Sequence, residues 1–166
     1  GQNKPAIAFC ISVKHGQYVT NKFKQAGYTA ELITGSMKSD DRKTLIDNFK
    51  DGKVQILVSI DVVSEGFDVE GCYVAILLRP TQSEALYIQQ VGRVLRPEPN
   101  KVAIVLDHVG NTKRHGFVDD IREYDLHQKA KTKRKGELAP AVETCEVCFA
   151  VYLSLIHISE PTRRKR

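Results

Sequence analysis

Short, nearly apolar segments alternate with amphipathic segments over the first 107 residues, and no other feature constrains the fold of this chain as strongly. The apolar segments have the length of strands and occupy residues 6–11, 28–33, 54–60, 73–78 and 101–107. Near-continuous apolar strands separated by amphipathic helices are typical of a parallel sheet that helices cover on both faces. The sequence therefore predicts an α/β fold of three layers with a parallel sheet in the middle.

Two of the amphipathic segments carry clear helix signals. Residues 13–27 are preceded by Ser12 as a possible N-cap and are closed by Gly27. Residues 39–52 begin with Ser39 as the expected N-cap and carry two aspartates in the first turn. In a parallel sheet, ligands bind at the carboxyl ends of the strands, so we expect the chemistry in the loops that follow the strands.

The stretch "SEALYIQQVGRVLRPEPNK" at residues 83–101 opens as a third helix with a glycine in its interior. On a helical wheel, one side is apolar and consists of Tyr87, Ile88, Val91, Val94 and Leu95. The opposite side carries Gln89, Arg93 and Arg96, with Gly92 beside them. Glycine costs roughly 1 kcal/mol relative to alanine inside a helix, but it lets another group come close to the backbone.

Two guanidinium groups in a row suit phosphate, because the planar fork offers paired hydrogen bonds and a charge that does not titrate. The alternative is a solvated face whose arginines pair with surface carboxylates. The helix taken alone favours neither interpretation.

A second polar segment, Ser64 to Asp68, follows the strand at residues 54–60. Gly66 permits a tight turn, and Asp68 can accept hydrogen bonds from sugar hydroxyls or orient a basic partner. The segment alone is a weak signal. It becomes strong together with the Q-x-x-G-R-x-x-R pattern that begins at Gln89 in the same sheet.

These residues carry a resemblance to a known family. "SIDVVSEGFDV" and "QQVGRVLRP" resemble motifs V and VI of the superfamily 2 helicases, the DEAD/DEAH-box group, and "FCISVKH" is similar to motif IV. "LLRPTQSEALYIQQVGRVLRP" and "VLDHVGNTKRHG" resemble the RadD-like bacterial and phage members. The resemblance covers about residues 5–128, with several motifs in the right order and at the right spacing.

The resemblance implies the second RecA-like lobe of a helicase motor, with ATP between two lobes. It makes Arg93 and Arg96 arginine fingers that reach the ATP phosphates, since a guanidinium stabilises the charge of phosphoryl transfer without moving a proton. It places Gly66, Asp68 and Gln89 on the nucleotide side, with Gly92 beside them.

On the nucleic-acid side, the resemblance implies contacts from Ser12, Gly35 and Ser59 to backbone phosphates, which bind without reading sequence. The DEAD-box pattern has threonine where this chain has Ile60. Ser59 or Ser64 is then the nearest hydroxyl for the motif V contact.

Two parts of an ATPase are not found in the sequence. It contains no G-x-x-x-x-G-K-[ST] loop to hold phosphates and no D-E-x-[DH] sequence to hold Mg²⁺. We therefore expect ATP and Mg²⁺ to be held mainly by a first lobe outside this chain, whose abrupt start fits a fragment. The fragment by itself is expected to be inactive as an ATPase.

The four cysteines do not suggest a disulfide framework. Cys10 and Cys72 lie in apolar segments and are expected to be buried thiols, which fits a reducing, cytoplasmic setting. Cys145 and Cys148 form a C-x-x-C, half of a four-ligand Zn²⁺ site. A redox pair or two unpaired surface cysteines are the alternatives.

The net charge of +5 is not concentrated on the predicted fold. It gathers in "KAKTKRK" at 129–135 and "RRKR" at 163–166, and such runs are usually solvated. The ending "LSLIHISEPTRRKR" resembles translated sequencing adapter and holds four basic residues against one acidic, or +3 of the total. A genuine short tail is the alternative.

The sequence thus predicts four parts: a RecA-like helicase lobe at 1–110, a charged, partly helical extension at 111–140, a truncated zinc-knuckle-like module at 141–152, and read-through at 153–166. The predicted function is the second motor lobe of an ATP-dependent helicase or translocase on nucleic acid, DNA rather than RNA, with no membrane role. The alternatives are the translocase subunit of a restriction system and a non-catalytic nucleic-acid-binding module.

Overall fold

The computed structural model describes residues 4–60 and 71–122, together with the backbone of residues 142–144 and 151–153. The chain divides into two compact units, Gly1–Val109 and Gly110–Arg166. No helix within the described residues combines the length and the apolar character needed to cross a membrane.

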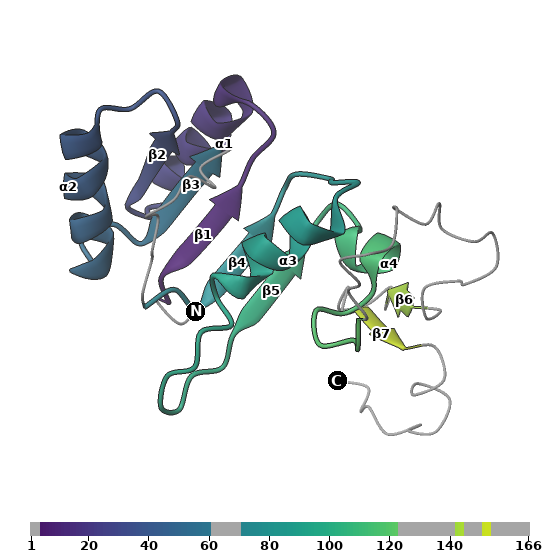
Figure 1. Cartoon of the computed structure of the whole chain (residues 1–166). Coiled ribbons are helices and arrows are strands. Elements are labelled where there is room, and N and C mark those ends of the chain that lie inside the picture. The colour runs from purple at the N-terminus through teal and green to yellow at the C-terminus, as the bar shows by residue number, and fades with distance from the viewer. Residues whose placement is uncertain (1–3, 61–70, 123–141, 145–150, 154–166) are drawn as a thin grey trace, which may run out of the picture. The chain divides into compact units, whose positions relative to one another are not determined.

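The first unit contains a five-stranded sheet whose strands all run in parallel (Figure 1). Its order is β2-β3-β1-β4-β5. The strands are β1 Ala6–Phe9, β2 Ala30–Thr34, β3 Ile56–Ile60, β4 Val74–Leu77 and β5 Ile104–Asp107. Each strand lies within a few residues of its predicted position, and the parallel α/β prediction is confirmed.

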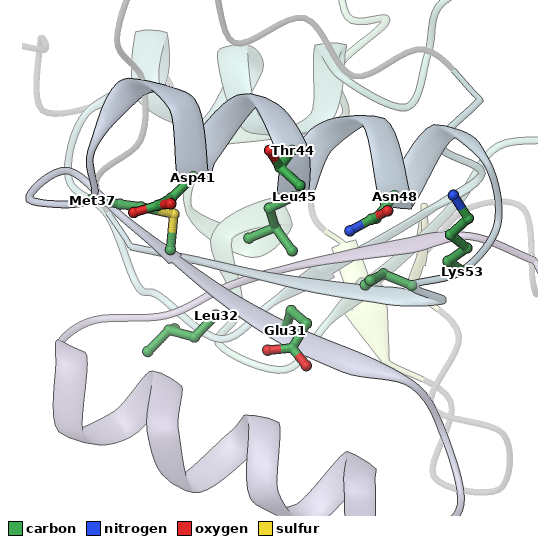
Figure 2. Close-up of a pocket in the computed structure, with 9 residues that line it drawn as sticks. Glu31, Leu32, Met37, Asp41, Thr44, Leu45, Asn48 and Lys53 are labelled. Carbon is green, nitrogen blue, oxygen red and sulfur yellow. The ribbon is translucent and has the colours of Figure 1, made fainter.

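Three helices connect these strands: α1 Val13–Gln25, α2 Ser39–Lys50 and α3 Glu84–Gly92. The step from β1 to β2 runs toward one edge of the sheet, whereas the steps from β2 to β3 and from β4 to β5 run toward the other. Right-handed crossovers then place α1 on one face and the other two helices on the opposite face. Figure 2 shows α1 and α2 on opposite sides of the sheet.

The core explains why the strands are apolar at nearly every position. Ala8, Val58 and Ile76 belong to the cluster that α1 covers, while Ile7 and Leu57, one residue out of phase, have no exposed surface. Successive side chains point to opposite faces of a sheet. A strand covered on both faces therefore buries consecutive residues.

Glycine lets α1 lie close to this sheet. A Cβ added to Gly16 would stand 2.7 Å from both Ile60 Cδ1 and Leu32 Cδ1. Real Cβ atoms do not approach so closely, because the repulsion exceeds any packing gain. The helix glycine at position 16 is thus explained by contacts within the chain.

The structure confirms the cap of α1 and corrects that of α2. Ser12 is the N-cap of α1, where its Oγ accepts a hydrogen bond from the His15 N–H at 3.3 Å. Before α2 the N-cap is Lys38, which makes no side-chain cap bond, and Ser39 is already helical. The predicted Ser39 cap is therefore wrong by one residue.

The third helix is shorter than the sequence predicts. Ser83 caps α3, which ends at Gly92, so Arg93 is the C-cap and Arg96 lies beyond the helix. Pro97 keeps Arg96 out of the helix, since the residue before a proline is disfavoured in the helical region, and the helix already ends at Gly92, a poor helix former. The prediction that Gln89, Arg93 and Arg96 share one face of a helix is therefore wrong.

The apolar side of α3 also differs in part from the prediction. Tyr87, Val91 and Val94 are buried as expected, but Leu95 is 48% exposed. The missed member of the buried side is Gln90, which is only 3% exposed. Its Oε1 has no hydrogen-bond partner, an unusual state for a buried polar atom.

The second unit contains the short helix α4 Asn111–His115 and two short strands. After α4, the Arg122 guanidinium donates to four backbone carbonyls, those of His115, Phe117, Val118 and Asp120. β6 Val142–Thr144 and β7 Val151–Leu153 pair antiparallel. Leu153, where the adapter-like segment begins, pairs with Val142.

Candidate nucleotide and nucleic-acid surfaces

The predicted arginine fingers lie at the carboxyl-terminal end of α3. This helix returns from the end of β4 to the start of β5. Arg93 and Arg96 therefore lie toward the amino ends of the strands. The expectation that the chemistry lies in loops at the carboxyl ends of the strands does not hold for this pair. Both side chains are partly exposed.

Gly92 has no explanation among the described residues. Apart from its chain neighbours and the nearby backbone of its own helix, none of their atoms lies within 4 Å of the place where a Cβ would be. Its φ lies outside the left-handed region, so the backbone does not require glycine either. The position leaves open space beside two arginine residues.

The acidic segment expected to face the nucleotide falls within residues 61–70. Gly66, Asp68 and Ser64 therefore lie outside the residues that the structure describes. The residue that follows the segment, Gly71, is described, and it contacts the residues just after motif VI. The Gly71 N–H donates a hydrogen bond of 3.3 Å to Glu98 Oε1, and Glu98 lies two residues after Arg96.

Two of the three described nucleic-acid candidates lie at the carboxyl ends of strands. Ser12 follows β1 and Gly35 follows β2, and only β3 separates these strands in the sheet. Both residues are exposed. Ser59 lies inside β3, paired with Phe9 and Ile33, and is 2% exposed. Its hydroxyl is not at the surface, so we correct the prediction that Ser59 contacts phosphate.

The start of α1 has the features of an anion site. The Ser12 Oγ accepts from His15, which leaves its hydroxyl hydrogen able to donate. The first N–H groups of a helix lack partners within the helix, and the helix dipole favours negative charge there. No acidic residue lies in the first turn of α1. This end of the helix can therefore hold a phosphate.

Sequence reasoning missed the residue that shapes the turn at Gly35. Arg42, in the first half of α2, donates from one guanidinium nitrogen to the Gly35 carbonyl at 2.9 Å and to the Met37 carbonyl at 3.1 Å. The side chain thus fixes the turn from within the chain. The sequence signals it only weakly: Arg42 is the first residue of an "R…F…G" pattern, completed by Phe49 and Gly52, that precedes the segment resembling motif V.

The cysteines divide into two groups. Cys10 and Cys72 are free and buried, and burial raises the pKa of each thiol to about 11. Cys145 and Cys148 lie outside the described residues, between β6 and β7. Among the residues that the structure does describe, no group of three His, Cys, Asp or Glu side chains could hold a metal ion.

A groove of about 520 Å³ lies between α2 and the edge strand β2 (Figure 2). Its lining mixes carboxylates, a lysine and aliphatic side chains, among them Glu31, Asp41, Lys53, Leu45 and Met37. None of the predicted site residues lines it. Leu45, on this side of α2, is only partly buried and leaves the groove open. The groove is not part of the arginine site.

Comparison with solved structures agrees with the fold. The C-terminal domain of the DEAD-box protein Dbp5 matches with a TM-score of 0.57 and 25% identity, covering 68% of this chain and 66% of that one. Domain 2 of the DEAD-box helicase Mss116p, solved with an RNA duplex, matches with a TM-score of 0.53 and 27% identity, covering 63% and 42%. The sheet is therefore the RecA-like one that the sequence predicts.

Among characterised sequences, a 51.5 kDa protein of a Lactococcus phage (isolate 7-9) is 33% identical over 148 residues. The match covers 89% of this chain but only 33% of the phage protein. The putative ATP-dependent helicase IRC3 of Saccharomyces cerevisiae is 31% identical over 108 residues, which cover 64% of this chain and 16% of IRC3. The chain thus spans a third or less of these relatives.

The family comparison matches the helicase conserved C-terminal domain over residues 1–98, more than half of the chain. Those residues contain the whole of α1, α2 and α3 and both predicted arginine fingers. This chain therefore belongs to the family of helicase conserved C-terminal domains.

Proposed function

We propose that this chain is the second motor lobe of an ATP-dependent helicase or translocase, and that Arg93 and Arg96 reach the phosphates of ATP bound between two lobes. The proposal rests on the arrangement of residues at the end of α3. Two arginines follow a glycine that neither the backbone nor the described packing requires, next to the flank of the acidic segment. The relative IRC3 is named a putative ATP-dependent helicase, which supports the proposal.

The chemistry required of this lobe is electrostatic. In phosphoryl transfer, charge gathers on the oxygens of the leaving and transferred groups, and a guanidinium stabilises that charge without a proton step. Gly92 leaves the space in which a phosphate or a neighbouring backbone comes close. Asp68 would accept from the ribose hydroxyls, and Gln89, exposed on α3, would face the same nucleotide.

Among the described residues, no group of three or more His, Cys, Asp or Glu side chains could hold a metal ion. In this proposal the metal ion and the phosphate loop belong to the first lobe. ATP hydrolysis between the lobes then drives an opening and closing motion that moves a nucleic-acid strand.

The nucleic-acid side of the proposal rests on the ends of β1 and β2. The start of α1, with Ser12, and the turn at Gly35 offer backbone N–H groups and a hydroxyl to phosphates. Such contacts bind the backbone of DNA or RNA without reading its sequence. We favour DNA on the RadD-like motifs, although the Mss116p relative was solved with RNA.

The test of the fingers is the change Arg93→Ala in a helicase where this lobe is joined to a lobe with a phosphate loop. Nucleic-acid-stimulated ATP hydrolysis should fall by about a thousandfold or more, the usual scale for an arginine finger. Nucleic-acid binding should change by less than about threefold, because the contacts of α1 remain. Unchanged ATP turnover would contradict the assignment of Arg93 as an arginine finger.

The test of the nucleic-acid surface compares two N-caps of the same kind. Ser12→Ala and Ser83→Ala each remove a serine cap, at α1 and at α3, and each should cost about 1 kcal/mol of stability. Only Ser12→Ala should weaken binding of a fluorescent single-stranded oligonucleotide. Equal weakening in both variants would show a general effect of stability. DNA and RNA oligonucleotides of one sequence decide between the two substrates.

A further inference from the structure

The segment after Arg96 forms a tight turn that its sequence specifies. In Glu98-Pro99-Asn100-Lys101, the Lys101 N–H donates to the Glu98 carbonyl at 3.1 Å. Asn100 has a φ of 60°, the only positive value among the described residues other than glycine. Proline at the second position and asparagine at the third favour a type II turn. The turn fixes the two charged residues at its ends.

The side chains of this turn reach back to the strand before it. Glu98 Oε1 accepts from Lys101 Nζ at 3.0 Å and from the Gly71 N–H at 3.3 Å. The Lys101 Nζ also lies 5.3 Å from the centre of the Tyr73 ring. Glu98, Lys101, Tyr73 and the Gly71 backbone, called the brace below, thus join the residues that precede β4 to the residues that follow α3.

The burial of Lys101 separates the brace from ordinary surface ion pairs. The Lys101 side chain is 3% exposed and that of Glu98 32%, whereas the side chains of the Lys53–Asp51 pair are 67% and 58% exposed. Exposed pairs contribute little to stability. A lysine is rarely so buried unless it is paired, and removal of one partner leaves the other charge uncompensated. The buried pair therefore holds the side chains of Lys101 and Glu98 in one fixed arrangement.

The position of the brace connects the two segments of the proposed ATP site. Gly71 comes three residues after Asp68, and Glu98 comes two residues after Arg96. A hydrogen bond between Gly71 and Glu98 limits how far these two residues can separate. Arginine fingers depend on such limits, because a displacement of about 1 Å can reduce a rate a hundredfold.

We propose that Glu98 is a positioning residue that, through the brace, holds Arg96 in register with Gly71 and the residues that lead into β4. This inference rests on the proposed function for its catalytic consequence. Its structural part stands independently and is tested on this chain alone.

The first experiment measures amide hydrogen exchange by NMR in the chain described here. In Glu98→Ala, the Gly71 amide should exchange at least tenfold faster, while the Tyr73 amide, which donates to the Pro5 carbonyl, should change by less than threefold. The matched control is Glu31→Ala, which breaks the exposed Lys24–Glu31 pair of 2.8 Å far from the brace. Unchanged exchange at Gly71 in Glu98→Ala would overturn the brace.

The second experiment separates positioning from stability in the two-lobed helicase. In Glu98→Ala, kcat for ATP hydrolysis should fall at least tenfold while KM for ATP changes by less than twofold, because the finger acts in the transition state. The double variant Glu98→Gln/Lys101→Met removes both charges but keeps an acceptor for the Gly71 N–H. It should recover most of kcat.

The outcomes distinguish this inference from the proposed function. If Arg93→Ala lowers kcat but Glu98→Ala does not, the brace has no positioning role, whereas the assignment of the arginine fingers is retained. If the double variant stays as slow as Glu98→Ala, the charge of Glu98 and not its hydrogen bond is required, which also contradicts the inference. If neither Arg93→Ala nor Glu98→Ala changes kcat, the proposed function fails.

Discussion

Two helices of this lobe each carry a glycine, and the reasons for the two glycines differ. Gly16 in α1 faces the sheet, where a Cβ would collide with the ends of Ile60 and Leu32. Gly92 closes α3, and a Cβ there would meet no atom of the described residues. The chain's own core accounts for the first glycine and not for the second.

The arginines of the two regions differ in the same way. Arg42, beside the turn at Gly35, donates to two backbone carbonyls and so shapes its own surroundings. Arg93 and Arg96 follow a glycine that local packing does not require. A glycine that the core requires is weak evidence for function, and a glycine that the described packing leaves unexplained, such as Gly92, is the better marker of a ligand site.

The largest expected effect concerns Gly16, the glycine that the core requires. Gly16→Val should destabilise the lobe by about 3 kcal/mol, because the larger side chain overpacks the contact between α1 and the sheet. Denaturant unfolding followed by circular dichroism measures the change. A loss below about 0.5 kcal/mol would show that α1 shifts freely, and Gly16 would then no longer contrast with Gly92.

The next effect compares a structural arginine with its neighbour. Arg42→Ala should cost about 2 kcal/mol of stability, since two hydrogen bonds from a charged donor are lost. It should also weaken oligonucleotide binding by disturbing the turn at Gly35. Lys43→Ala, exposed on the same helix, is the control and should do neither. Equal effects of both changes would contradict the role given to Arg42.

The smaller effect at Gly92 has the opposite sign. Gly92→Ala should raise the free energy of unfolding by about 0.5–1 kcal/mol, because alanine has less chain entropy to lose and meets open space. The same change should lower ATP turnover in the two-lobed helicase about tenfold. A variant that is more stable and fully active would show that nothing outside the chain requires this glycine.

The smallest expected effect concerns pH and Glu98. The hydrogen bond from Lys101 lowers the pKa of the Glu98 carboxyl below its usual value of 4.5. A depressed folded-state pKa contributes stability above the unfolded-state pKa, and this contribution is lost as the pH falls through the folded-state pKa. The stability difference between wild type and Glu98→Gln should therefore shrink between pH 6 and pH 3. A constant difference in chemical denaturation over that range would contradict this.

Sequence periodicity predicted the helices and strands of the first unit but not their ends. The five strands and the helices at 13–27 and 39–52 follow from apolar spacing and helix-end signals. Periodicity extended α3 across Arg96, whereas the helix ends at Gly92. Helix ends depend on local competition between backbone hydrogen bonds, here under the influence of Pro97, which a wheel does not represent.

For the site, motifs in the sequence identified candidate residues, and burial in the structure then separated those at the surface from those inside the fold. Ser59 matched a motif, but its place inside a central strand removes it from the surface. Arg42 and Glu98 matched no motif with an assigned role, because their roles depend on backbone groups that only the folded chain brings to them, the carbonyls of a nearby turn for Arg42 and the distant Gly71 amide for Glu98. Such partners become visible only when the chain is folded.

The sequence by itself determined the class of fold and the order of strands and helices, because these depend on spacing along the chain. The tertiary structure alone decided which glycine the core requires, which serine reaches the surface, and that Gly71 meets Glu98. These depend on distances between segments far apart in sequence, which the packing of α1 and α3 against the sheet sets.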